Sequence, residues 1–173
     1  MKQGSIGLLS VVLGMMILAP SAMAGTLVEF DGGIGVNGVS RVDGTASVGD
    51  AVRNIVRGVS PGGQPWVIRK FEAKVKENGD IKAEGKGLVL AGGNGIGRPP
   101  ANAMVVAALF CGSDVPHSSE PVPLEPDGDF KIKDRLSPVP PDPCPNSVLL
   151  IRLNNSTGPW IAAGIPKLEE EDD

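Results

Sequence analysis

The sequence predicts an all-β fold, an antiparallel β-sandwich of Ig-like or related Greek-key type with about seven to nine short strands and one disulfide. The chain of 173 residues contains 24 glycines and 16 prolines, which divide it into short segments. Many segments are rich in valine and isoleucine, the β-branched residues that favour strands. Almost no long stretch shows the periodicity of about 3.6 residues that is typical of an amphipathic helix.

Residues 1–24 have the layout of a secretory signal peptide. Lys2 precedes an apolar run from Ile6 to Ala19, and Ala22-Met23-Ala24 forms an A-x-A cleavage site. The alternative is a membrane anchor, but the run of 14 residues is shorter than the roughly 20 that a spanning helix needs. We therefore expect a mature protein that begins at Gly25, is secreted or periplasmic, and does not insert into a membrane after cleavage.

Residues 25–168 are expected to form a single domain, because a chain of this length buries one core. Lys2 lies in the leader, so 15 of the 16 lysines and arginines remain, against 20 acidic residues. Five of those acids form segment 169–173, which we expect to be a disordered tail. The domain itself is neutral, which argues against a nucleic-acid partner.

Segments that are rich in apolar residues and bounded by turn residues are expected to be strands. They are Leu27–Phe30, Asn54–Val59, Trp66–Val75, Ile81–Leu90, Met104–Cys111, Pro121–Leu124, Phe130–Lys133, Ser147–Leu153 and Trp160–Ile165. Residues 50–57 leave a short helix open as an alternative, because an N-cap residue, Asp50, precedes helically spaced apolar positions and Gly58 follows them.

The stretch KENGDIK (76–82) predicts a hairpin whose register can be derived. A two-residue loop would place Val75 opposite the charged Lys82. A three-residue loop, with Gly79 in the left-handed conformation of a G1 bulge, pairs Val75 with Ile81 instead. We expect this register because it gives the hairpin one apolar face.

The stretch EPDGDFK (125–131) has the same turn pattern. The same three-residue loop pairs Leu124 with Phe130 and Val122 with Ile132, and proline suits the second position of its type I turn. The sequence therefore predicts a second hairpin with one apolar face.

The two tryptophans and the two cysteines give the remaining structural predictions. Residues 61–65 are expected to form a proline- and glycine-rich turn that places Trp66 in extended geometry. Trp160 follows a similar turn, so we expect the two rings at two ends of one core.

Cys111 and Cys144 are expected to pair, since an exported chain meets an oxidising compartment. That disulfide would tie a proline-rich connection to a core strand.

The composition argues against an enzyme, because the chain has a single histidine. His117 lies beside Asp114, Ser118 and Ser119, which together suggest a hydrolase as an alternative function. Neighbours in a proline-rich loop do not generally fold onto one another as a working triad. We therefore expect no catalytic residues, and one histidine with two paired cysteines is too few for a zinc site.

Two further motifs are candidate ligand sites. Glu125, Asp127 and Asp129 form an acidic cluster, which suggests calcium-dependent binding or adhesion as another alternative, although turn chemistry explains the cluster without metal. GIGVNG (33–38) matches G-x-G-x-x-G but precedes no helical pattern, so we interpret it as a glycine-rich turn. We expect no cofactor.

Eight strings between residues 30 and 167 carry a resemblance. They are FDGGIGV, NIVRGVSPGGQPWVI, KGLVLAGGNGIG, LFCG, VPLEPDGDFKI, PDPCPN, VLLIRL and WIAAGIPK. Together they resemble a family of small exported bacterial proteins with which no activity is associated. The resemblance implies a secreted domain with Cys111 and Cys144 paired and carries over no catalytic residue. The expected function is a non-catalytic exported β-sandwich with a structural or binding role toward a cell-surface or protein partner.

Overall fold

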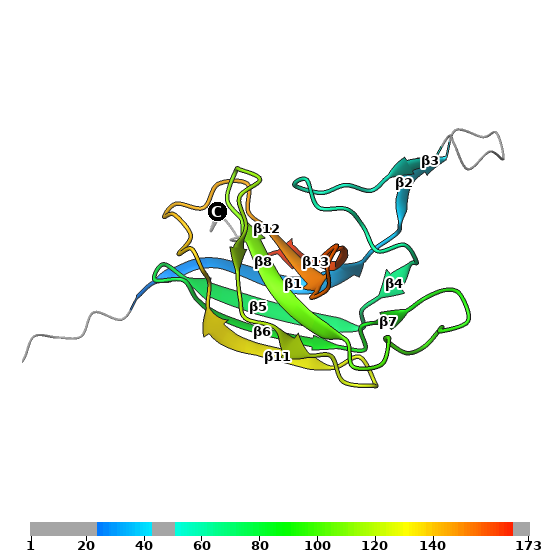
Figure 1. Cartoon of the computed structure of the whole chain (residues 1–173). Coiled ribbons are helices and arrows are strands. Elements are labelled where there is room, and N and C mark those ends of the chain that lie inside the picture. The colour runs from blue at the N-terminus through cyan, green and yellow to red at the C-terminus, as the bar shows by residue number, and fades with distance from the viewer. Residues whose placement is uncertain (1–23, 43–50, 168–173) are drawn as a thin grey trace, which may run out of the picture.

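The computed structural model describes residues 24–42 and 51–167, and this part of the chain contains thirteen strands and no helix (Figure 1). The strands are β1 (Thr26–Gly35), β2 (Val39–Val42), β3 (Ala51–Arg53), β4 (Trp66–Val67), β5 (Lys70–Lys76), β6 (Asp80–Lys86), β7 (Val89–Leu90), β8 (Met104–Phe110), β9 (His117–Ser118), β10 (Val122–Pro123), β11 (Phe130–Arg135), β12 (Val148–Leu153) and β13 (Trp160–Pro166). The described residues include no helix able to cross a membrane. Apart from Ala24, the predicted signal peptide lies outside the described residues, as does the predicted tail 169–173.

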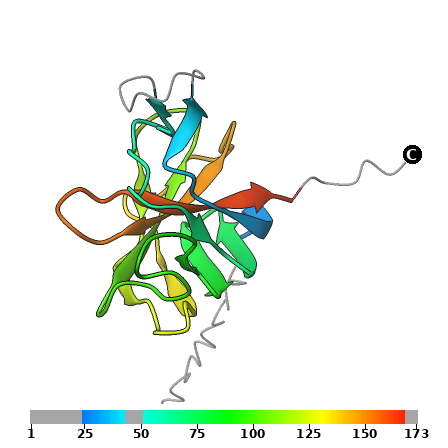
Figure 2. The ribbon, with the colours of Figure 1, turned by 90° about the vertical axis from the view of Figure 1, so that its right-hand side faces the viewer.

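Nine strands form one antiparallel sheet in the order β10-β8-β12-β13-β1-β5-β6-β11, with β9 paired to β8. The sheet curls so that β8 and β12 lie across from β5 and β6 (Figure 1), and the buried apolar residues between them form one cluster. The pairs β2–β3 and β4–β7 are separate two-stranded sheets, and the β2–β3 ribbon projects from the body (Figure 2). The all-β class is confirmed, whereas the two stacked sheets of a sandwich are not, because both layers belong to one ladder.

The two ends of the curled sheet meet beside β10 and β11. At one end the turn between these strands is closed by the N–H of Glu125, which donates to the carbonyl of Asp129 at 2.9 Å. At the other end Ser118 and Ser137 exchange two backbone hydrogen bonds, each of 2.9 Å. Because β10 and β11 form no ladder with each other in the described chain, these bonds hold the ends of the sheet together.

Strands β5, β6 and β11 alternate between buried and exposed side chains except at their end residues and at Asp134. The predicted first hairpin is confirmed, because Val75 pairs with Ile81 and Ala73 with Ala83. Its turn has the expected form, since Gly79 adopts a φ of 84° and its N–H closes the loop. The charged residues between these apolar positions must therefore point away from the core.

The second hairpin is confirmed in its turn and wrong in its strand pairing. Gly128 adopts the expected left-handed φ of 85°. Val122 and Ile132 do not pair, because β10 pairs with β8 and β11 pairs with β6. Phe130 lies opposite Gly85, and its ring occupies the space that a Cβ at Gly85 would need. This fit favours β6 as the partner of β11.

Two predicted strands break where the ribbon turns away from the large sheet. The stretch from Trp66 to Val75 divides into β4 and β5 on either side of Arg69. The stretch from Ile81 to Leu90 divides at Gly87, which adopts a left-handed φ of 64°. Beyond these two points β4 and β7 pair only with each other.

Three expectations near the N-terminal third of the domain are wrong. Residues 33–35 of the glycine-rich motif belong to β1, so that motif is not simply a turn. The alternative helix does not form, because residues 51–53 are strand β3 and the chain turns at Arg57 and Gly58, with φ values of 49° and 71°. The expected strand at residues 54–59 is likewise replaced by this turn.

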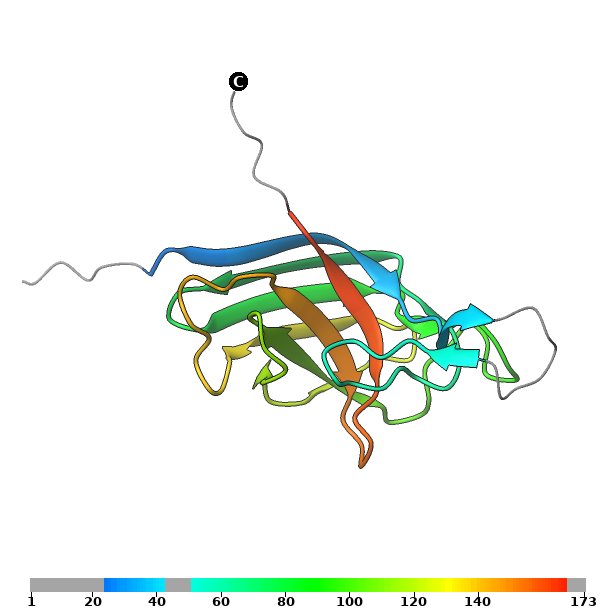
Figure 3. The same ribbon diagram turned by 90° about the horizontal axis from the view of Figure 1, so that it is seen from above.

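A loop formed by residues 54–65 lies across β12 and β13 (Figure 3). The N–H of Gly62 donates to the carbonyl of Trp160 at 2.9 Å, and the guanidinium of Arg57 donates to the carbonyl of Asn146 at 2.8 Å. Beneath the loop Leu150 and Ile161 are fully buried. The loop therefore explains why β12 and β13 lack the alternation of β5 and β6.

The two tryptophans are both buried, and they lie near the same residue, Gly62, and not at two ends of the core. A Cβ at Gly62 would lie 3.3 Å from the indole nitrogen of Trp66, and the N–H of Gly62 donates to the carbonyl of Trp160. The indole N–H of Trp160 donates to the carbonyl of Asn54 at 2.9 Å. The ring of Trp160 therefore anchors the loop 54–65.

The predicted disulfide between Cys111 and Cys144 is confirmed, and it closes a loop with a sequence separation of 33. Replacement of both cysteines by serine is expected to lower the free energy of unfolding by about 3–4 kcal/mol, because loop closure restricts the unfolded chain. Urea unfolding of the variant and of the natural chain measures this difference. A loss below about 1 kcal/mol would contradict the entropic account.

Gly35 is required because strand β4 passes too close for a side chain. A Cβ at this position would overlap the carbonyl oxygen of Trp66. We expect Gly35→Ala to destabilise the protein by about 1–3 kcal/mol, the usual cost of overpacking. Gly63→Ala is the matched control, because no atom lies within 4 Å of a Cβ there. Equal unfolding midpoints in urea for the two variants would contradict this explanation.

Candidate functional site

Three lysines stand in a row across the outer face of the curled sheet. Lys74 of β5 lies directly opposite Lys82 of β6, and Lys82 lies directly opposite Lys133 of β11. All three side chains are exposed. Directly opposite residues have Cβ atoms about 4.5–5.5 Å apart, and like charges at this distance destabilise a sheet. We call these three lysines the basic row.

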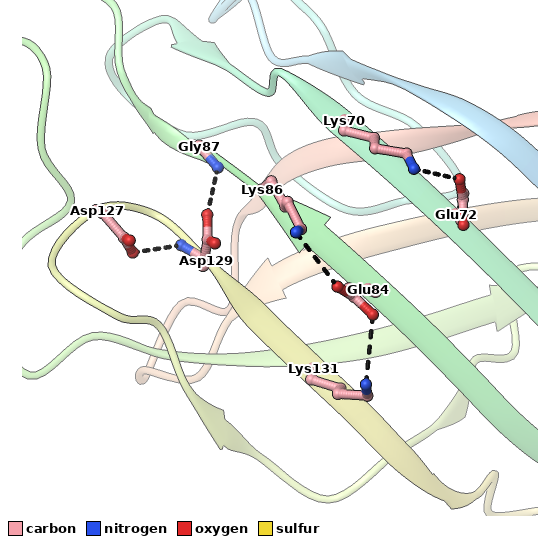
Figure 4. A network of polar contacts seen from close by, with 8 residues as sticks. All are labelled: Lys70, Glu72, Glu84, Lys86, Gly87, Asp127, Asp129 and Lys131. Atoms are coloured by element: carbon pink, nitrogen blue, oxygen red, sulfur yellow. Dashed lines mark hydrogen bonds and ion pairs between the residues drawn. The ribbon is translucent and has the colours of Figure 1, made fainter.

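The next row along the same strands is acidic, and lysines neutralise it (Figure 4). Glu72 lies directly opposite Glu84. The ammonium of Lys70 lies 2.7 Å from a carboxylate oxygen of Glu72. Glu84 has two cations nearby, Lys131 at 3.4 Å and Lys86 at 3.8 Å. Both carboxylates therefore have a compensating positive charge.

The basic row is not neutralised in the same way. Glu29 of β1 pairs with Lys74 at 2.6 Å and more loosely with Lys167 at 3.7 Å. Within residues 24–42 and 51–167, Lys82 and Lys133 form no ion pair and no side-chain hydrogen bond. Two of the three lysines in the basic row are therefore left without a compensating carboxylate in the described structure.

Additional cations lie around the basic row. Lys76 follows Lys74 on β5, and Arg135 follows Lys133 on β11, where its Nε lies 3.1 Å from a carboxylate oxygen of Asp80. The basic row, Lys76, Arg135 and Lys167 are six cations, and the carboxylates paired with members of this set are those of Glu29 and Asp80. Because residues 25–168 are neutral as a whole, the fold concentrates positive charge at this part of the face.

A shallow groove of about 630 Å³ runs along the basic row. Its charged lining is mixed, with the three lysines, Lys131 and Lys167 as cations and with Glu29, Asp31, Glu72 and Glu84 as carboxylates. A neighbouring hollow of about 490 Å³ is lined by the same three lysines and extends toward the end of β11. All three lysines of the basic row therefore line both depressions.

The ion pairs at the margin of the basic row keep their carboxylates charged. The hydrogen bond and the positive charge of Lys74 lower the pKa of Glu29. Hydrogen bonds from the amide of Asn78 and the guanidinium of Arg135 lower the pKa of Asp80. Both carboxyl groups therefore stay ionised at pH values below the usual pKa range of carboxyl groups.

The structure places the candidate hydrolase residues in a backbone network. His117 is buried, and its Nδ1 lies 2.8 Å from the carbonyl oxygen of Pro138. A carbonyl only accepts, so Nδ1 must be the donor. The buried hydroxyl of Ser119 accepts the N–H of Ala107 and donates to the carbonyl of Glu120, each at 3.0 Å. The proton of each group is therefore directed at a carbonyl.

Asp114 and Ser118 do not complete a triad. Asp114 is exposed in the bend before β9, and no hydrogen bond or ion pair joins its side chain to any residue of the described chain. Ser118 uses its backbone to bond Ser137, and its hydroxyl makes no hydrogen bond with His117. These residues are therefore neighbours in the sequence, but their side chains do not form a triad in the described chain.

The acidic cluster of the second turn serves the backbone (Figure 4). Asp129 accepts the N–H of Gly87 at 2.9 Å, and Asp127 accepts the N–H of Asp129 at 3.1 Å. Glu125 is exposed and closes the turn through its main chain. In the described chain, no three carboxylate, histidine or cysteine groups converge where a metal ion could bind. Turn formation accounts for Asp127 and Asp129.

Sequence reasoning missed the basic row, although part of the signal was present. The derived register of the first hairpin, with Val75 opposite Ile81, already places Lys74 opposite Lys82. Lys133 was not recognised as their neighbour, because β11 was predicted to pair with the segment before the turn. Only the observed pairing of β11 with β6 brings the third lysine into line.

Comparisons of this chain with protein-family models, with curated proteins and with solved structures found no match. The resemblance to small exported bacterial proteins therefore stays an expectation from the sequence.

A charge reversal tests the repulsion within the basic row. We expect Lys82→Glu to raise the free energy of unfolding by about 0.5–1 kcal/mol at low ionic strength, because it places opposite charges beside Lys74 and Lys133. Lys131→Glu is the control, and it should lower stability because Lys131 pairs with Glu84. Chemical unfolding at low and at 1 M salt measures both effects. Shifts of the same sign in the two variants would contradict the assignment.

The lowered pKa of Glu29 predicts how stability depends on pH. Its folded-state pKa lies below its unfolded value, so the stabilisation is complete above the unfolded pKa and is lost as pH falls through the folded one. We expect the melting temperature to fall below about pH 4, and to fall less in Glu29→Gln. Glu120→Gln is the control, since no ion pair of Glu120 exists within the described residues. Equal pH profiles for the two variants would count against this role of Glu29.

Proposed function

We propose that the protein is an exported, non-catalytic binding module that holds an acidic segment of a partner protein on its basic row. The observation that carries the proposal is the direct opposition of Lys82 and Lys133, neither of which has a carboxylate partner in the described chain. Opposed like charges lower the stability of the free protein, and a bound anion removes that penalty. The opposed lysines therefore destabilise the free protein, and a bound anion compensates their charge in the complex.

The geometry of the basic row suits closely spaced carboxylates. Ammonium groups are point charges with rotatable donors, so they do not require the planar ligand that an arginine fork recognises. Neighbouring strands place the lysines about 4.8 Å apart. Along an extended acidic peptide, successive side chains are about 3.4 Å apart in rise and those on one side about 7 Å, which brackets the lysine spacing. A run of glutamate and aspartate therefore matches the row.

The strength of such a contact is modest and depends on salt. Exposed ion pairs contribute about 0.2–1 kcal/mol each, and salt screens them within about 10 Å at 0.1 M. The charge surplus around the basic row, with Lys76 and Arg135 beside it, also attracts an acidic partner before contact. We therefore expect weak, reversible binding that strengthens at low ionic strength.

Two further observations support the other parts of the proposal. Export is supported by the leader-like residues 1–24 and by the disulfide between Cys111 and Cys144, since disulfides persist in oxidising compartments. A non-catalytic role is supported by the backbone bonds of His117 and Ser119, which leave neither group directed at the other. A nucleophile and its base need that mutual hydrogen bond.

Fluorescently labelled poly-L-glutamate is the probe that tests the binding function. We expect the full chain to bind it at low salt, and Lys82→Gln/Lys133→Gln to weaken binding roughly five- to thirtyfold, which corresponds to about 0.5–1 kcal/mol per lysine. Fluorescence anisotropy measures the affinity. The matched control is Lys86→Gln, whose side chain lies next to Glu84, and its affinity should stay unchanged.

Three results would overturn the proposal. One is the absence of poly-L-glutamate binding at low salt. Another is an equal loss in Lys86→Gln, which would show a general charge effect. The third is binding of dextran sulfate but not of poly-L-glutamate, which would assign the basic row to a polysaccharide.

A further inference from the structure

We infer that the acidic segment 169–173 of the same chain occupies the basic row when no partner is bound, and so regulates access to it. The segment consists of three glutamates and two aspartates and lies outside the described residues. This inference rests on the proposed function, because it assigns an internal competitor to the same binding surface. It follows from where the described chain ends, from the length of the segment, and from charge.

The described chain ends at the edge of the groove. Lys167 follows β13, and its backbone N–H donates to the carbonyl of Glu29 at 2.9 Å. Its ammonium lies 3.7 Å from the carboxylate of Glu29, which also pairs with Lys74 of the basic row. Both Glu29 and Lys167 line the groove. The acidic segment therefore begins two residues after a side chain that already lies beside the basic row.

The segment is long enough to cross the row. The strand order β13-β1-β5-β6-β11 places Lys82 three strand spacings and Lys133 four strand spacings from β13. These spacings correspond to about 14 Å and 19 Å. Six residues such as 168–173 can span at most about 20 Å, since each residue of an extended chain spans roughly 3.3–3.6 Å. The carboxylates of the segment therefore reach both uncompensated lysines.

The charges match as well as the distances. The basic row with Lys76, Arg135 and Lys167 provides six cations, and segment 169–173 supplies five negative charges. The carboxylates of the described chain that line the groove are Glu29, Asp31, Glu72 and Glu84, and Asp80 lines the neighbouring hollow. Lys82 and Lys133 have no carboxylate partner within the described residues. The segment offers the same chemistry as the proposed acidic partner, so the two compete for one surface.

Covalent attachment makes this weak contact effective. A short tether gives an effective concentration of about millimolar, which occupies about half of the molecules when the intrinsic dissociation constant is of that order. A partner then binds only the fraction of molecules in which the row is free, which lowers its apparent affinity by that fraction. The segment therefore sets a threshold that a partner with a longer or denser acidic run overcomes.

The test neutralises the segment within the full chain, through Glu169→Gln, Glu170→Gln, Glu171→Gln, Asp172→Asn and Asp173→Asn together. We expect this neutral-tail variant to bind poly-L-glutamate about two- to tenfold more tightly than the natural chain at low salt. The gain should vanish when Lys82→Gln/Lys133→Gln is added. Equal affinities of the natural chain and the neutral-tail variant would overturn the inference while leaving the proposed function intact.

A second measurement needs no external ligand. We expect the neutral-tail change to lower the melting temperature at low salt by roughly 1–5 °C in the natural background and not at all in the Lys82→Gln/Lys133→Gln background. Lys86→Gln is the control background, in which the decrease should persist. A decrease of the same size in all three backgrounds would overturn the inference. If poly-L-glutamate binds to no variant but the lysine-dependent shift is observed, the segment occupies the row and the proposed partner fails.

Discussion

The burial of one face of β5, β6 and β11 is the constraint on which the structure depends. Because side chains alternate with a period of two, Phe71, Val75, Ile81 and Ile132 can enter the core only if the residues between them point outward. Those intervening residues are almost all charged. The register that aligns the apolar side chains therefore also aligns the charges, and it produces the basic row as a consequence of packing.

The two layers of the curled sheet meet this constraint in different ways. The layer with β5, β6 and β11 leaves its outer face to solvent, whereas the loop 54–65 covers β12 and β13 on their second face. The structure thus has one face sealed by its own chain and one face that presents ordered charge. A sheet face with uncompensated like charges reduces stability, and such departures from the most stable arrangement are typical of functional surfaces.

Local chemistry in the sequence predicted much of the fold. The alternation around residues 76–82, the left-handed Gly79 and the pairing of Cys111 with Cys144 each depend on a short segment or on two residues. The partner of β11 did not follow from local chemistry, because the turn at residues 125–129 forms without a continued hairpin and the fit of Phe130 over Gly85 decides the pairing. The basic row depends on that distant pairing, so the sequence predicted its first two members at most. The loop 54–65 was missed for the same reason, since its bonds to Trp160 and Asn146 span most of the domain.

The basic row therefore depends most directly on the pairing of β11 with β6. Cross-strand nuclear Overhauser effects in an isotope-labelled full chain test it directly, because directly opposite residues of antiparallel strands bring backbone protons close together. We predict backbone contacts between Lys82 and Lys133 and between Ala83 and Ile132. Contacts between Val122 and Ile132 in their place would separate Lys133 from Lys82 and contradict the account.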